Sequence, residues 1–189
     1  MSDLVEVAGD LQDFCQANDW QFCFIGGLVV QHWGEPRMTI DVDLTLLTGF
    51  GGEEKWIDAL LANWSPRIDG ARNFALANRV LLLKTNSGVG IDIALGGLEF
   101  EKVAIDRARE VEVVPGRTLR FCTAEDLIIM KAFANRPRDW EDIQGIIVRQ
   151  GNSNLDWTHI FHHLRPLAEA KENPELVTRL ESLSQRVSK

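Results

Sequence analysis

The sequence lacks the features that would place the chain in a membrane or in an oxidising compartment. No apolar run approaches the roughly 20 residues that span a lipid bilayer. The opening stretch MSDLVEVAGDLQDF contains no basic segment followed by an apolar one, so we expect no export signal. Cys15, Cys23 and Cys122 are odd in number and lie among apolar residues, which favours reduced core thiols over a disulfide framework. We therefore expect a cytoplasmic protein without membrane association.

The sequence also has little positive charge. It contains 20 lysine and arginine residues against 28 aspartate and glutamate residues, which gives a net charge of −8 at pH 7. Proteins that bind nucleic acid non-specifically over a broad surface neutralise phosphates with basic side chains. The net charge argues against such a surface, although it is compatible with a local basic patch. With 45% apolar and 25% charged residues, the composition is otherwise that of an ordinary globular domain.

The hydrophobic pattern predicts a small mixed β-sheet flanked by helices, followed by a helical C-terminal part. We expect a helix over residues 3–18 and strands over residues 21–25 and 37–47. A hairpin is expected over residues 78–97, with TNSG as its turn. Thr123 is expected to cap the first helix of the C-terminal part. The predicted fold class is α+β.

Two carboxylates interrupt the apolar strand expected over residues 37–47. Asp41 and Asp43 would project from one face, about 7 Å apart, because side chains alternate along a strand. Arg37 and Thr39 would share that face. The other face would be apolar, with Met38, Ile40, Val42 and Leu44. Two like charges repel unless a cation lies between them, and Mg²⁺ suits such oxygen ligands together with a substrate phosphate. A salt bridge to Arg37 on a solvated edge strand is the alternative.

Two further features favour a metal site. Asp92, flanked by Ile91 and Ile93, lies on a strand that could pair beside the first and supply a third carboxylate for one or two metal ions. Gly26 and Gly27 lie between a strand and a helical turn, where backbone N–H groups can approach a phosphate closely. Each feature alone is weak, because a lone Asp is more often an edge residue and a Gly-Gly pair more often a tight turn. Their combination with the acidic pair is specific.

This combination resembles the nucleotidyltransferase superfamily that shares the DNA polymerase β-like catalytic core. The superfamily motif is an apolar residue followed by Gly and Gly or Ser, then an acid–apolar–acid triplet and a third acid on a later strand. The matching residues are Ile25-Gly26-Gly27, Asp41-Val42-Asp43 and Asp92. The resemblance implies a nucleotidyltransferase catalytic core over residues 1–122, with a helical region over residues 123–189 packed on it.

Further residues make the chain most similar to the AbiEii-type branch, which includes toxins of type IV toxin–antitoxin systems. The branch carries R-x-T-x-D-x-D-L after the glycines, then a helix with E-D-L and a lysine, then an R-x-x-D segment. The corresponding residues are Arg37, Thr39, Asp41, Asp43 and Leu44, then Glu125-Asp126-Leu127, Lys131, Arg136 and Asp139. The similarity covers residues 25–148. Members of the branch often have a larger helical C-terminal domain than the one expected here.

The resemblance implies that a nucleoside monophosphate moves from ATP or another nucleoside triphosphate to an acceptor hydroxyl. The implied metal ligands, for one or two Mg²⁺ ions, are Asp41, Asp43 and Asp92. Asp92 could alternatively accept the proton of the acceptor as a general base. The implied catalytic residues are Asp41, Asp43, Asp92, Lys131 and Asp139. The implied nucleotide-binding residues are Gly26, Gly27, Arg37, Thr39 and Lys131.

Several of these side chains also have a structural interpretation. Lys131 lies among apolar residues, so its amine could reach a phosphate or extend into water along a buried stem. Asp139 and Asp142 are about one helical turn apart and could hold a basic side chain in place or lie on a solvated face. His159 and His163 are four residues apart, but two ligands make no structural zinc site, so we expect a solvated or partly buried helix face.

The sequence leaves the acceptor open. The AbiEii-type resemblance implies an RNA end such as that of tRNA, in a toxin-like enzyme with an antitoxin protein as partner. A small hydroxylated molecule, such as an aminoglycoside, is the alternative, and the net charge of −8 favours a cationic acceptor of this kind. A third hypothesis is a catalytically silent module that binds nucleotide or a partner protein. The presence of all three acids and both glycines argues against it.

Overall fold

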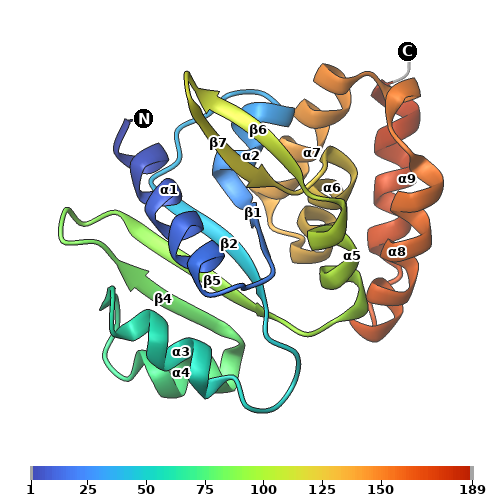
Figure 1. The fold of residues 1–189 in the computed structure, drawn as a ribbon. Helices are drawn as coiled ribbons and strands as arrows, with labels where there is room; N and C mark the ends of the chain where they lie inside the picture. Colours follow the sequence, from blue (N-terminus) through green and yellow to red (C-terminus); the bar gives the residue numbers. More distant parts are fainter. Residues whose placement is uncertain (1, 188–189) are drawn as a thin grey trace. The chain divides into compact units, whose positions relative to one another are not determined.

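The chain divides into two compact units in the computed structural model, which describes residues 2–187 (Figure 1). The sheet unit comprises Met1–Leu28 and Met38–Cys122, and the helical unit comprises Val29–Arg37 and Thr123–Lys189. The short segment 29–37 therefore belongs with the C-terminal helices, although in sequence it lies between the first two strands. The packing of the C-terminal region on a core over residues 1–122 stays a prediction.

The sheet unit is built on a mixed sheet of seven strands, in the order β3-β4-β5-β2-β1-β7-β6. β2 runs parallel to β5 and β1 runs parallel to β7, whereas the other neighbouring pairs are antiparallel. The strands are β1 (Phe22–Ile25), β2 (Asp41–Leu47), β3 (Ser65–Pro66), β4 (Val80–Lys84), β5 (Gly90–Gly96), β6 (Arg109–Val114) and β7 (Arg117–Phe121). The sheet and the helices around it confirm the predicted α+β class.

One face of this sheet is apolar and buried. The residues that share it are Phe22, Phe24, Val42, Leu44, Leu46, Leu81, Leu83, Ile91, Ile93 and Leu95, none of them more than 3% exposed. The burial of so many large side chains is the main stabilising contribution available to a sheet of this kind. Residues of the opposite parity on β2 and β5 project from the other face, where the acidic residues lie.

Four helices accompany the sheet within its unit: α1 (Ser2–Ala17), α3 (Glu54–Leu61), α4 (Ala71–Asn78) and α5 (Glu99–Arg107). α1 buries Leu4, Ala8, Leu11 and Cys15, which recur at helical spacing along one face. It lies in front of the sheet in Figure 1. The buried Gln12 ties α1 to β7, because its amide nitrogen donates to the Thr118 carbonyl and its amide oxygen accepts from the backbone N–H of Arg120.

The helical unit contains α6 (Ala124–Ala134), α7 (Pro137–Gln150), α8 (Trp157–Ala170) and α9 (Glu175–Val187), with a short 3₁₀ turn at Asn152–Asn154. As predicted, Thr123 caps α6, since its hydroxyl accepts from the backbone N–H of Asp126. α2 (Gly26–Trp33) begins in the sheet unit and continues into the helical one. Within residues 2–187, no helix is long and apolar enough to cross a membrane.

The strand predicted over residues 37–47 was wrong in its first four residues, because β2 begins only at Asp41. Met38 and Ile40, expected on the apolar face, are 83% and 70% exposed. The reason is the length of the neighbouring strands. The register of β5 starts with Gly90 opposite Asp41, and that of β1 ends with Ile25 opposite Asp43. Residues before Asp41 therefore extend beyond the paired part of either neighbouring strand.

The three cysteines are buried thiols outside any disulfide, as the sequence predicted. Burial raises the pKa of the Cys15 thiol to about 12, so at pH 8 almost all of it is the unreactive protonated form. We expect Cys15 to resist alkylation by iodoacetamide in the native protein and to react readily in urea, measured by mass spectrometry of its peptide. Alkylation of native Cys15 at the rate seen in urea would contradict this burial.

Candidate active site

The pairing of β2 with β5 brings the three predicted acids to one face of the sheet. Asp43 lies directly opposite Asp92, and Asp41 lies opposite Gly90. Directly paired residues on neighbouring strands share a face, and the strands are about 4.8 Å apart. The neighbouring Val42 and Ile91 are fully buried on the opposite face. The sheet therefore presents three partly exposed carboxylates side by side, one strand apart.

The cation between two of these carboxylates is Arg67, a residue that the sequence analysis did not single out. One guanidinium nitrogen, Nη1, lies 3.4 Å from Oδ1 of Asp41, and the other, Nη2, lies 2.5 Å from Oδ1 of Asp92. The backbone N–H of Arg67 donates to the carbonyl of Leu82 on β4 at 2.9 Å, which anchors the residue beside the sheet just after β3. No local pattern in the sequence marks this arginine among the 20 basic residues.

The third acid, Asp43, packs against the glycine pair. The backbone N–H of Gly27 donates to Oδ2 of Asp43 at 3.3 Å. Gly26 has a φ of +69°, and a Cβ placed on it would lie 2.0 Å from Oδ2 and 2.6 Å from Cβ of Asp43. Only glycine adopts this backbone conformation readily and leaves this space. The glycines therefore position a carboxylate, whereas their predicted contact with phosphate stays a prediction.

A further glycine, Gly90, makes room for the Asp41–Arg67 pair. A Cβ on Gly90 would lie 2.0 Å from Oδ1 of Asp41 and 2.6 Å from Nη1 of Arg67. Glycine inside a strand often marks such a close approach, so the GVGID segment carried a signal that the sequence analysis did not use. Thr39, predicted to bind nucleotide, lies just before β2, where its hydroxyl donates to the Asp41 carbonyl at 3.4 Å.

The donor set fits a hard divalent cation, because three carboxylates on adjacent strands offer the oxygen ligands that Mg²⁺ prefers. The guanidinium of Arg67 already occupies the space between Asp41 and Asp92. Within residues 2–187, no group of three or more His, Cys, Asp or Glu side chains is arranged to hold a metal ion as it stands. A dication would therefore need Arg67 to move.

The remaining predicted site residues lie in the helical unit, where they form a buried charge cluster. Nζ of Lys131 lies 3.2 Å from Asp139 and 2.6 Å from Asp142. Arg37 donates from Nε and Nη2 to the two carboxylate oxygens of Asp142, at 2.7 and 2.9 Å. The prediction that Arg37 shares a strand face with Asp41 was wrong, because Arg37 precedes β2. Its predicted role toward nucleotide stays a prediction.

Each member of this charge cluster has a structural role within the helical unit. Burial raises the pKa of Asp142, but the hydrogen bonds from Arg37 and Lys131 outweigh it and hold that pKa below its ordinary value. Asp139 also caps α7, since its Oδ2 accepts from the backbone N–H of Arg136 at 3.1 Å. Lys131 and Asp139 are only 6% and 7% exposed. Their predicted catalytic roles stay predictions.

One of the C-terminal histidines is held by a buried acid. Nε2 of His159 lies 2.6 Å from Oδ1 of Asp126, a carboxylate that is fully buried. The other oxygen of Asp126 accepts from the Thr123 hydroxyl at 2.7 Å. The Asp126 carboxylate therefore links the start of α6 to α8 through Thr123 and His159. These contacts give His159 a structural role between the two helices.

Several solved structures resemble this chain, and two of them match nearly its whole length. An antigenic nucleotidyltransferase-like protein from Paracoccidioides brasiliensis is 13% identical, with 97% of this chain and 93% of that one covered and a TM-score of 0.55. The antibiotic-resistance factor ANT(2'')-Ia is 15% identical, with 98% and 97% covered and a TM-score of 0.51. The chain has a nucleotidyltransferase-like fold.

No protein-family model matches the sequence, and no curated protein matches it significantly. At identities of 13% and 15%, the likeness concerns the fold and not the substrates. The finer resemblance to the AbiEii-type branch stays a prediction.

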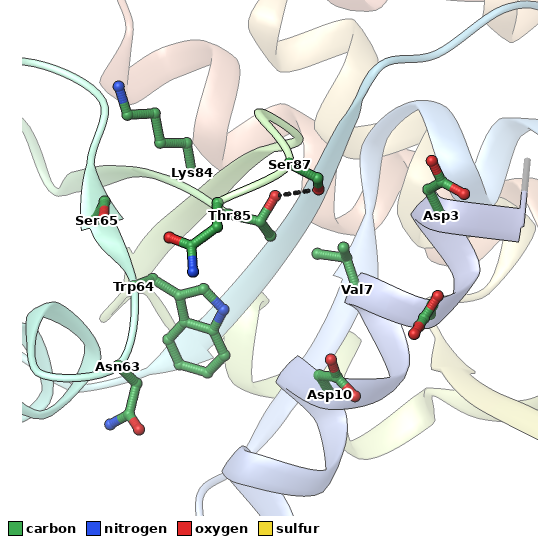
Figure 2. Close-up of a pocket in the computed structure, with 11 residues that line it drawn as sticks. Asp3, Val7, Asp10, Asn63, Trp64, Ser65, Lys84, Thr85 and Ser87 are labelled. Atoms are coloured by element: carbon green, nitrogen blue, oxygen red, sulfur yellow. Dashed lines mark hydrogen bonds between the residues drawn. The ribbon is translucent and has the colours of Figure 1, made fainter.

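A separate cavity of about 470 Å³ lies in the sheet unit between α1 and the turn that joins β4 to β5 (Figure 2). Asp3, Glu6 and Asp10 of α1 line one wall, and Trp64 and Lys84 contribute to the rest. The three acids paired by β2 and β5 are not among its described lining residues. This cavity is therefore distinct from the candidate active site.

We expect Gly26→Ala to lower the free energy of unfolding by about 3 kcal/mol, because an alanine there is both strained and overlaps Asp43. Gly70→Ala is the matched control. Gly70 has a similar φ of +67° at the start of a helix but open space around its missing Cβ, so only the strain, about 1 kcal/mol, applies. Chemical denaturation measures the free energy of unfolding of both variants. Equal losses would contradict the expected overlap and would mean that the Asp43 side chain moves aside without cost.

We expect Asp142→Asn to lower the free energy of unfolding at pH 7 by roughly 3 kcal/mol, because it removes a carboxylate that pairs with the buried Lys131 ammonium and with the partly exposed Arg37 guanidinium. The folded-state pKa of Asp142 is lowered, so its stabilising contribution is present above the ordinary value of 3.8 and disappears as the pH falls through the lower folded value.

The stability difference between wild type and Asp142→Asn should therefore narrow below about pH 4. Denaturation curves between pH 7 and pH 2.5 test this, with the exposed Asp58→Asn as a control that should change stability little. A stability difference that stays constant down to pH 2.5 would contradict the lowered folded-state pKa of Asp142.

Proposed function

We propose that the chain is a metal-dependent nucleotidyltransferase, which moves a nucleoside monophosphate from a nucleoside triphosphate to an acceptor hydroxyl. The observation that carries this proposal is the alignment of Asp41, Asp43 and Asp92 on one sheet face by the β2–β5 register. It is supported by the nucleotidyltransferase-like fold.

Each acid has a distinct task in the proposed reaction. Asp41 and Asp43 would hold one or two Mg²⁺ ions, which would supply positive charge to neutralise the triphosphate. The acceptor oxygen attacks the α-phosphorus as the bond to the pyrophosphate oxygen breaks, so pyrophosphate leaves with the electron pair. Asp92 lies on the neighbouring strand, where as the general base it would accept the proton of the acceptor hydroxyl. Its alternative role is that of a third metal ligand.

The residues proposed to bind the nucleotide follow from the superfamily resemblance. They are Gly26, Gly27, Arg37, Thr39 and Lys131, with Asp139 assigned to the catalytic set. Gly26 and Gly27 already lie against Asp43, at the start of α2, where backbone N–H groups favour phosphate. Arg37, Lys131 and Asp139 belong to the helical unit, and the three buried cysteines suit a reducing cytoplasm.

We favour a small, hydroxylated, cationic molecule as the acceptor. The net charge of −8 attracts a cation and repels RNA. The antibiotic-resistance factor ANT(2'')-Ia matches this chain over nearly the full length of both. An RNA end, in a toxin-like enzyme with an antitoxin partner, is the second candidate, and it rests on the AbiEii-type residues Arg37, Thr39 and Lys131.

We expect Mg²⁺ with a bound nucleoside triphosphate to stabilise the wild-type protein by about 2.7 kcal/mol at a hundredfold excess over Kd, roughly 5–10 °C in Tm. Asp43→Asn should lose most of this shift, because it removes a metal ligand while keeping the oxygen that accepts from Gly27. Asp58→Asn, an exposed acid on α3, is the matched control and should keep the shift. Each of ATP, GTP, CTP and UTP is tested by thermal denaturation.

The acceptor is identified with triphosphates labelled on the α-phosphate, because this label stays with the transferred group. We expect label on members of an aminoglycoside panel and none on total tRNA. Label on tRNA alone would replace the small-molecule acceptor by an RNA end. A protein that is stabilised by no nucleotide and labels nothing would be a silent module and not an enzyme.

A further inference from the structure

Arg67 bridges two of the three carboxylates that are the candidate ligands for divalent cations in the proposed reaction. Its two terminal nitrogens each contact a different carboxylate, Asp41 at 3.4 Å and Asp92 at 2.5 Å. All three side chains are partly exposed, between 28% and 39%, although Oδ1 of Asp92 itself is buried. The guanidinium thus supplies the positive charge that like-charged neighbours on one sheet face require.

This position is built by the surrounding chain. The backbone N–H of Arg67 is fixed to the Leu82 carbonyl, and the preceding residues Ser65 and Pro66 pair with β4. Gly90 leaves the space in which Oδ1 of Asp41 and Nη1 of Arg67 meet, since any Cβ there would overlap both atoms. The strand register and a glycine thus converge on the same ion pair.

A guanidinium and a dication compete for these carboxylates. Arg67 contacts Oδ1 of both acids, and a dication placed between the same two side chains would lie within a few ångströms of the guanidinium, where like charges repel each other strongly. Displaced from Asp41 and Asp92, Arg67 needs another anion nearby. The planar fork of arginine matches the oxygens of a phosphate as well as those of a carboxylate.

We propose that Arg67 is the internal cation that a divalent metal must displace from Asp41 and Asp92, and that the freed guanidinium then binds the triphosphate. The proposal rests on the proposed function and assigns it a further substrate-binding residue. Metal and triphosphate then bind cooperatively. The metal releases the Arg67 guanidinium for the triphosphate, and the triphosphate holds that guanidinium away from the metal ligands. Metal alone binds weakly, which protects the site from occupation without substrate.

The test uses Mn²⁺ alone as a probe of the metal site and inorganic tripolyphosphate with saturating Mg²⁺ as a probe of the phosphate site. Binding of Mn²⁺ is measured from the signal of the free ion in electron paramagnetic resonance, and binding of tripolyphosphate by calorimetry, both at one ionic strength. In Arg67→Gln we expect Mn²⁺ to bind about tenfold more tightly and tripolyphosphate about tenfold more weakly, a factor that corresponds to 1.4 kcal/mol each.

Arg72→Gln is the matched control. Arg72 forms an exposed pair with Asp58 through Nε at 2.7 Å, so the variant removes the same charge and an arginine–carboxylate pair elsewhere in the sheet unit. It should leave both affinities within about twofold of wild type, since exposed pairs contribute little. Opposite changes in Arg67→Gln alone support the proposal, because a residue with only a structural role would weaken both probes together.

Unchanged Mn²⁺ affinity or unchanged tripolyphosphate affinity in a folded Arg67→Gln overturns the proposal while leaving the proposed function intact. If wild type, Arg72→Gln and Arg67→Gln bind neither probe, the proposed function fails as well. Should Arg67→Gln not fold, Arg67→Lys carries the test. Lysine keeps one charge but loses the fork, so we expect Mn²⁺ to bind about threefold more tightly, and wild-type affinities for both probes would overturn the proposal.

Discussion

The parallel pairing of β2 with β5 is the constraint on which the candidate site depends. A shift of one residue would turn Asp92 to the buried face, where an ionised carboxylate cannot remain without a partner. The register is held by the apolar residues of the other parity, among them Leu44 and Ile93, which are fully buried. The alternation of residues along β2 and β5 therefore places apolar side chains in the core and the acids on the opposite face. The stability of the sheet and the geometry of the site depend on the same strand register.

In both units a basic side chain lies between two carboxylates, but its exposure to solvent differs. In the sheet unit, Arg67 lies between two partly exposed carboxylates, and the ions stay accessible to solvent. In the helical unit, Lys131 lies between Asp139 and Asp142, and almost no solvent reaches it. A partly exposed ion pair can be exchanged for another at low cost, whereas a buried one resists separation because its ions would have to be solvated. The first arrangement suits a ligand site and the second suits a structural element.

Much of the fold could be read from the sequence, because its signals are local. Alternation in β2 and β5, the capping residue Thr123 and the apolar spacing in α1 each act through neighbours along the chain. The error at Met38 and Ile40 has the opposite origin. The alternation of apolar and polar residues continues through these positions, but the pairing of β2 with β1 and β5 does not reach them. A local pattern does not show where a partner strand ends.

The sequence by itself determined which acids and glycines are present, their spacing, and the strand periodicity that puts Asp41 and Asp43 on one face. Only the tertiary structure decided what these acids contact. Arg67 is distant from Asp41 and Asp92 along the chain, and Gly90 accommodates their meeting without any charge of its own. Contacts of this kind arise when separate strands are brought together, and the periodicity of one strand carries no information about the side chains of another.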